Sequence, residues 1–164
     1  MSDLSDVRTA IDDGRKQLDQ ALAACGERWG AAVLAPEAEE VNPRATGDAW
    51  TPRQAAEHAI GGNGMFVRMV AAGLERDAPA LEPLSRESAD DARAALRTAI
   101  ERSDGLLDAV AADDLARPTG LADRQIDYAR SRGREITKSV EGALWMMALH
   151  MADHAQQIAG AGER

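Results

Sequence analysis

Apolar side chains recur along this chain at steps of three and four residues, the spacing that places them on one face of an α-helix. The first such stretch begins at Leu4 and reaches Val33, and Pro36 lies just beyond it. The pattern predicts one long helix that stops near this proline. Its apolar positions are Leu4, Val7, Ile11, Leu18, Leu22, Cys25, Trp29 and Val33.

The second predicted helix has the clearest start signal in the chain. Thr51 supplies a capping hydroxyl, Pro52 suits the first helical position, and Gln54 completes a capping box. Trp50 lies just before the cap, where an apolar residue can staple the incoming chain. The inward face of this helix is predicted to consist of Ala55, Ala59, Gly62, Phe66, Met69 and Gly73.

Two more helices follow, and patterns typical of strands are almost absent. One helix is expected to start around Ser88 and run to about Val110, and the last to start near Thr137 and end at Gly160. Four long helices, each with one apolar face, predict an all-α four-helix bundle. The length of 164 residues is typical of a single domain, taken here as residues 1–164.

Residues 112–136 form an unusually long connection between the third and the last long helix. A short helix is expected within it at residues 123–130. Long connections often serve as lids or binding loops, although an ordinary crossover between bundle ends explains this one equally well. The connection also holds the densest basic cluster of the chain, which either steers an acidic ligand or forms a solvated face: Arg124, Arg130, Arg132 and Arg134.

The charge balance narrows the range of partners. With 19 Lys and Arg against 28 Asp and Glu, the net charge is −9, which argues against binding to nucleic acid or to anionic membranes. Cys25 is the single cysteine, so neither an internal disulfide nor a cysteine-rich zinc site can form. The N-terminus lacks the layout of a signal peptide, and no apolar run approaches the about 20 residues of a membrane span. A cytoplasmic protein is therefore expected.

The chain has only three histidines, and their placement suggests a metal site. His150 and His154 are four residues apart on the last predicted helix, so they share one face, and His154 occupies an inward position. His58 flanks the inward face of the second helix. A three-histidine site therefore requires only that the second and the last helices be neighbours. Three imidazoles with an open fourth position are typical of catalytic zinc sites, and nickel, iron and copper also accept such ligands.

Another interpretation of the histidines remains open at this stage, in which His150 and His154 are core side chains that bond to the backbone or to carboxylates. Gln157 shares the face of His150 and His154 and is expected to orient a bound cofactor or water, or alternatively to bond to a neighbouring helix. The carboxylates that could support a metal-bound imidazole are Glu57, Asp153, Glu141 and Asp48.

Two segments of the chain resemble a known family. Residues 50–58, Trp-Thr-Pro-Arg-Gln-Ala-Ala-Glu-His, resemble the Trp-Ser/Thr-Pro…His element of DinB-like proteins. Residues 149–158, Leu-His-Met-Ala-Asp-His-Ala-Gln-Gln-Ile, resemble their His-x-x-x-His-x-x-Gln-Ile element, and the likeness extends over about residues 5–160. The resemblance implies an up-up-down-down bundle, homodimers, and a divalent metal held by His58, His150 and His154.

The same superfamily includes bacillithiol S-transferases and mycothiol-dependent maleylpyruvate isomerases. The resemblance therefore implies a metal-dependent thiol S-transferase or isomerase that uses a low-molecular-weight thiol on a small-molecule substrate. A metal-dependent hydrolase with Glu57 or Asp153 as base, and a stress-associated binding dimer without turnover, are the alternatives. The glycines at positions 61, 62 and 64 either leave room beside the metal for a ligand or allow close helix packing.

Overall fold

The computed structural model describes residues 3–30, 50–81, 83 and 85–160. Within these residues the chain forms five α-helices, two short 3-10 helices and no strand, which confirms the expected all-α class. Four of the helices have 20 or more residues and α4 is short. The elements are α1 (Leu4–Ala23), η1 (Gly26–Trp29), α2 (Pro52–Gly73), α3 (Ala89–Asp108), η2 (Ala112–Asp114), α4 (Asp123–Ser131) and α5 (Val140–Ala159).

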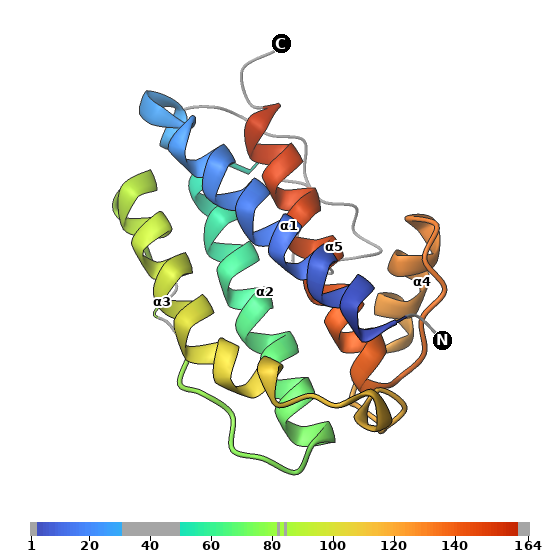
Figure 1. Cartoon of the computed structure of the whole chain (residues 1–164). Coiled ribbons are helices and arrows are strands. Elements are labelled where there is room, and N and C mark those ends of the chain that lie inside the picture. The colour runs from blue at the N-terminus through green and yellow to red at the C-terminus, as the bar shows by residue number, and fades with distance from the viewer. Residues whose placement is uncertain (1–2, 31–49, 82, 84, 161–164) are drawn as a thin grey trace.

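The four long helices lie side by side, and α4 packs against α5 (Figure 1). Helices α1 and α3 are antiparallel, because Arg8 near the start of α1 donates to the carbonyl of Asp108, whereas Asp19 near its end binds Arg93. Helices α2 and α5 are also antiparallel, since Gly73 at the end of α2 lies against Val140 at the start of α5, whereas Trp50 just before α2 stacks on His154. Figure 1 shows α1 and α5 running in the same direction.

The direction of the long helices along the chain is therefore up, down, down, up. The up-up-down-down arrangement implied by the resemblance is not confirmed, and α4 adds a fifth helix to the expected four. This arrangement places α5 against both α1 and α2. The histidine-bearing faces of α2 and α5 thus come together within the bundle.

Two of the expected helix boundaries are wrong. Helix α1 ends at Ala23 because Gly26 has a φ of 53°, a left-handed conformation that interrupts the α-helix. Residues 31–36, where the helix was expected to stop, lie outside the described residues. Helix α5 begins at Val140 instead of Thr137, because the side chain of Ser139 caps it by accepting from the backbone N–H of Gly142.

Other boundaries agree with the sequence. Thr51 and Gln54 form the predicted capping box, and Ser88 caps α3 by accepting from the backbone N–H of Asp91. The short helix expected at 123–130 is α4. Three of the four clustered arginines have partners within the protein: Arg132 pairs with Asp153, Arg130 with Asp127 and Glu135, and Arg134 lies over the ring of Trp145.

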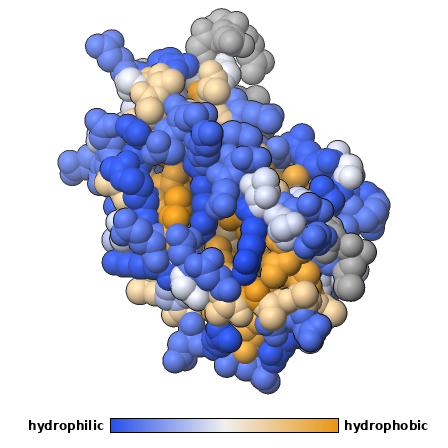
Figure 2. Space-filling view, viewed as in Figure 1, coloured by the Kyte–Doolittle hydropathy of each residue, from blue (hydrophilic) through white to orange (hydrophobic). Residues whose placement is uncertain are grey.

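The core lies where the long helices meet. Its largest fully buried apolar side chains include Phe66, Leu18, Leu22, Leu96, Met147, Met151 and Ile158. Cys25 is buried there too, and desolvation raises the pKa of its thiol, as expected of a packing residue. Hydrophilic residues cover most of the face shown in Figure 2, with hydrophobic strips between them. No helix in the described residues is both long and apolar enough to cross a membrane.

An ion pair between α1 and α3 is expected to make stability depend on pH. Arg93 donates to both carboxylate oxygens of Asp19 at 3.0 Å, and this bonding lowers the pKa of Asp19. A depressed pKa stabilises the fold above the unfolded value of about 3.9, and the stabilisation is lost as the pH falls through the folded value. Because the pair is partly exposed, Asp19→Asn should cost only about 0.5–1 kcal/mol at pH 7.

The test is urea unfolding of wild type and Asp19→Asn at pH 7 and pH 3. The difference between the two proteins should shrink at the lower pH. Asp13→Asn removes the same charge from an exposed position on α1 and is the matched control. A difference that stays constant between the two pH values would exclude the ion pair as its source.

Candidate metal centre

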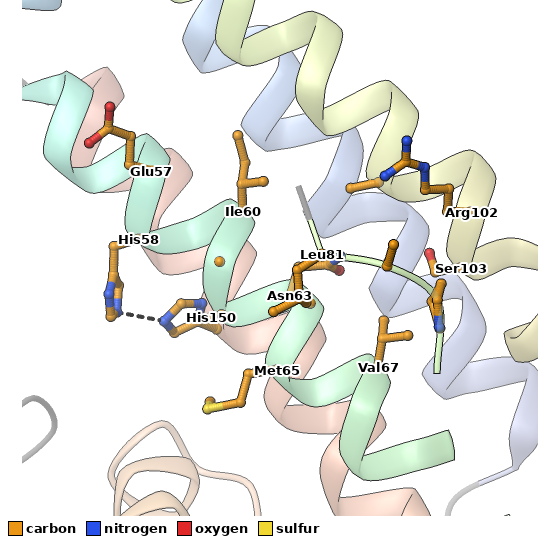
Figure 3. A pocket seen from close by; sticks show the side chains of 16 residues that line it. Glu57, His58, Ile60, Asn63, Met65, Val67, Leu81, Arg102, Ser103 and His150 are labelled. Carbon is orange, nitrogen blue, oxygen red and sulfur yellow. Dashed lines mark hydrogen bonds between the residues drawn. The ribbon is translucent and has the colours of Figure 1, made fainter. Parts of the chain in front are cut away.

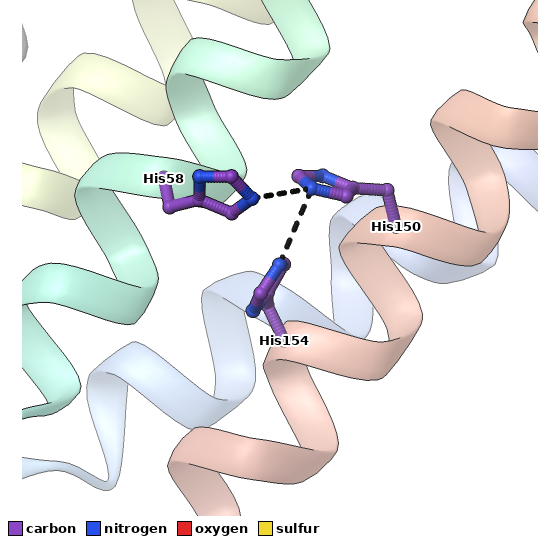
Figure 4. Close-up of side chains that lie close together, drawn as sticks. All are labelled: His58, His150 and His154. Atoms are coloured by element: carbon purple, nitrogen blue, oxygen red, sulfur yellow. Dashed lines mark hydrogen bonds between the residues drawn. The ribbon is translucent and has the colours of Figure 1, made fainter. Parts of the chain in front are cut away.

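The three histidines of the chain meet between α2 and α5. The Nε2 atom of His150 lies 3.0 Å from Nε2 of His58 and 3.3 Å from Nε2 of His154 (Figure 4). His150 and His154 are 6% and 2% exposed, and His58 is half-buried. Among the described residues, this is the group of His, Cys, Asp or Glu side chains that could hold a metal ion, with ligand atoms within 4.8 Å of one another.

The positions of the three histidines along α2 and α5 explain why their rings meet. His150 and His154 lie on successive turns of α5, so their rings project from one face. The capping box at Thr51 fixes where α2 begins, and His58 follows in its second turn. Because α2 and α5 are antiparallel, His58 comes opposite the pair.

The hydrogen bonds around the rings show which nitrogens are available to a metal. Nδ1 of His154 lies 2.8 Å from Oε1 of Gln157, and an amide oxygen can only accept, so Nδ1 carries the proton. With the proton on Nδ1, Nε2 of His154 is the nitrogen that faces the other histidines and is available to a metal. Gln157, expected to orient a cofactor, here orients a candidate ligand. Such a partner fixes the tautomer of a metal-bound imidazole.

The arrangement of the three Nε2 atoms suits coordination of a cation better than hydrogen bonding between the rings. His150 Nε2 has two nitrogen neighbours, yet a neutral imidazole has a single N–H and can donate to only one of them. Burial, together with the nearby His154 and His58, lowers the pKa of His150 well below its usual value, so its ring is neutral. Two nitrogens bound to one tetrahedral zinc at about 2.0–2.1 Å lie about 3.3–3.4 Å apart, close to the observed separations.

Aromatic side chains enclose the three rings. Trp50 lies edge-on to His58 with ring centres 5.1 Å apart, and it stacks on His154 at 6.0 Å with an angle of 14°. Phe66 packs against His150 at 5.7 Å. The sequence predicted only that Trp50 packs at the start of the second helix and that Phe66 faces inward. Their contact with the histidines depends on the packing of α2 against α5.

Gly62 is the glycine that makes room for a histidine. A Cβ atom at this position would lie 2.4 Å from Cε1 of His150, closer than the ring permits. A Cβ at Gly64 would instead meet the end of the Leu81 side chain. Of the two interpretations offered for these glycines, close packing holds at Gly62, because a ring of α5 occupies the space that a side chain would fill.

Two of the carboxylates considered as partners of the histidines bond to other groups. Glu57 accepts from the side chain of Arg53 and from the backbone N–H of Arg86. Asp153 accepts from the hydroxyl of Tyr128 and from Arg132. Glu141 lies in the first turn of α5, and Asp48 lies outside the described residues. Gln157 does lie on a candidate ligand, because its Oε1 atom is 2.8 Å from Nδ1 of His154.

Comparison with known proteins identifies the family. The family model of the DinB superfamily matches residues 10–158, which include all three histidines and Gln157. Neither the search of curated proteins nor the search of solved structures returned a match. Because the match covers nearly the whole chain, this protein belongs to the DinB superfamily.

Proposed function

We propose that this protein is a divalent-metal-dependent thiol S-transferase or isomerase that joins a low-molecular-weight thiol to a small electrophilic substrate. The observation that carries the proposal is the meeting of three imidazole Nε2 atoms in a largely buried site. The ligand set favours zinc, and nickel, iron or copper would also be accepted. Membership of the DinB superfamily adds support.

The bound metal would supply thiol activation, since coordination to such a cation deprotonates a thiol. The protein's own residues prepare the site for this chemistry. Gln157 holds His154 with its Nε2 toward the other rings, and burial keeps His150 neutral. Trp50 stacks on His154, and Phe66 packs against His150. Addition of the thiol, and its later elimination in an isomerase, would use the same arrangement.

The environment of the carboxylates favours thiol transfer over hydrolysis. A hydrolase needs a proton acceptor near the metal-bound water. Glu57 and Asp153 were the candidates, and each already accepts hydrogen bonds from two groups, including an arginine. Thiol transfer would need no such acceptor, so these carboxylates suit a thiol nucleophile better than water.

The remaining parts of the proposal concern partners and location. We infer a cytoplasmic homodimer that acts on small molecules and binds neither nucleic acid nor membranes. The net charge of −9 supports the inference that the protein binds neither nucleic acid nor membranes, because it would repel their phosphate groups. The homodimer and the location come from the family resemblance and from the sequence.

The reaction is tested by combining zinc-loaded protein with mycothiol or bacillithiol and 1-chloro-2,4-dinitrobenzene. The thioether should form at least about 100-fold faster than with chelator-treated protein, because a metal contributes several kcal/mol to such a reaction. Adding zinc back should restore the rate. Equal rates with and without metal would contradict the proposal. Ester hydrolysis without thiol would instead favour the hydrolase, and inactivity in both assays the binding protein.

A further inference from the structure

A cavity of about 410 Å³ opens beside the histidines. It lies between α2, α3 and the segment at residues 79–81, and His58 and His150 form one end of it (Figure 3). Its volume is within the about 300–1,000 Å³ of typical small-molecule sites. A ligand in this cavity would therefore reach the histidine cluster without any rearrangement of the helices.

Small side chains keep the cavity open. Gly61, Gly62 and Gly64 of α2 line one side, and Ala99 of α3 lies on another. Three glycines so close together cost about 1 kcal/mol each in helix stability relative to alanine. Gly62 accommodates the ring of His150, and Gly64 accommodates the end of the Leu81 side chain. The apolar part of the wall consists of Ile60, Met65, Val67, Pro79, Ala80 and Leu81.

The most exposed large hydrophobic side chains gather at this same cavity. Within the described residues, Met65 is 39% exposed and Leu81 is 47% exposed, and both line it. Exposed apolar groups that cluster around a concave site typically mark a binding surface. A bound apolar molecule would remove part of these side chains from water, at about 25 cal/mol for each Å² covered.

The charged groups on the wall are few and opposite in sign. Glu57 lies near the histidine end, with its carboxylate held by Arg53 and by the backbone of Arg86, and Arg102 lies on α3 (Figure 3). Among the described residues, the lining between them carries no other Asp, Glu, Lys or Arg. This distribution suits an uncharged molecule better than an anion or a cation.

We propose that the cavity binds the hydrophobic body of an uncharged, mainly apolar electrophile, with its reacting carbon at the end formed by His58 and His150. The reaction itself rests on the function proposed above, whereas occupation of the cavity does not require the metal. For an aryl chloride, the thiolate sulfur forms a bond to the ring carbon and the C–Cl bond breaks. Chloride leaves with the bonding pair, and the thiol proton passes to solvent.

Binding can be measured on metal-free protein by ligand-observed NMR with 1,3-dinitrobenzene, which is uncharged and has no leaving group. The wild type should bind it, and Ala99→Phe should weaken binding at least about tenfold by filling the cavity. Ala94→Phe, at an exposed position of the same helix, is the matched control and should bind like wild type. The anion 3,5-dinitrobenzoate should bind more weakly than 1,3-dinitrobenzene.

A second variant tests the same cavity in case Ala99→Phe does not fold. Leu81→Ala removes an exposed apolar group from the cavity and should weaken binding about fivefold. In the zinc-loaded enzyme, Ala99→Phe should raise the KM for 1-chloro-2,4-dinitrobenzene and leave the KM for the thiol unchanged. Absence of binding, equal binding by wild type and both variants, or preference for the benzoate would overturn the inference. Binding without turnover would refute the proposed function alone.

Discussion

The His58→Ala variant is expected to lose its bound metal. His58 supplies the only imidazole of α2 at a site whose other two rings come from α5, and its Nε2 lies 3.0 Å from that of His150. Removing the partner behind a ligand already lowers metal affinity about 10–100-fold, so loss of a ligand should cost more than about 100-fold. Elemental analysis of protein purified from zinc-replete medium, followed by competition with a chromogenic chelator, measures this change.

Arg68→Ala provides a control on the same helix, because Arg68 is exposed and lies apart from the histidines along α2. It should retain the metal content of wild type. Since His58 is half-buried at the side of the core, the helix content of His58→Ala should remain unchanged by circular dichroism. A wild-type protein without metal, or a His58→Ala variant that keeps it, would leave the core-histidine interpretation as the better one.

Gly62→Ala is expected to damage the same site without removing a ligand. The added Cβ would lie 2.4 Å from Cε1 and 2.8 Å from Nδ1 of His150, so either the ring must turn or α2 and α5 must separate. Either movement takes Nε2 of His150 away from His58, and metal affinity should fall by at least about 100-fold. The imidazole is confined by its neighbours, so overpacking should also lower stability by about 1–3 kcal/mol.

Gly105→Ala is the matched control for this substitution. Gly105 is also inside a long helix, and nothing lies within 4 Å of the Cβ that alanine would add. This variant should keep the metal and gain about 0.4–1 kcal/mol, since alanine favours helix more than glycine does. Chelator competition and urea unfolding of both variants give the two readouts. Wild-type metal affinity in Gly62→Ala would show that His150 does not need its observed position.

The local signals in the sequence were sufficient for most of the fold. The starts of α2 and α3 follow from Thr51 and Ser88, whose side chains bond to backbone groups only three residues away. Such bonds depend on neighbouring residues alone, so they can be predicted without the tertiary structure. The end of α1 was missed because apolar spacing continues through Cys25 and Trp29 although Gly26 turns the backbone.

The start of α5 was missed for a different reason. Thr137 and Ser139 can both cap a helix, and the choice depends on a segment far away in the chain. The backbone N–H of Thr119 donates to the carbonyl of Lys138, and that of Val140 donates to the carbonyl of Arg117. These long-range bonds keep Lys138 and Ser139 outside the helix, so Ser139 is the cap and α5 begins at Val140.

By itself, the sequence determined that the chain is helical, where α2 and α3 begin, and that His150 and His154 share one face, because helical periodicity and capping are local. Only the tertiary structure decided that His58 meets them, that Gln157 bonds to His154, and that Gly62 accommodates a ring. These contacts depend on the rotation and offset of α2 against α5. Both are set by the packing of the whole core, and no short segment encodes them.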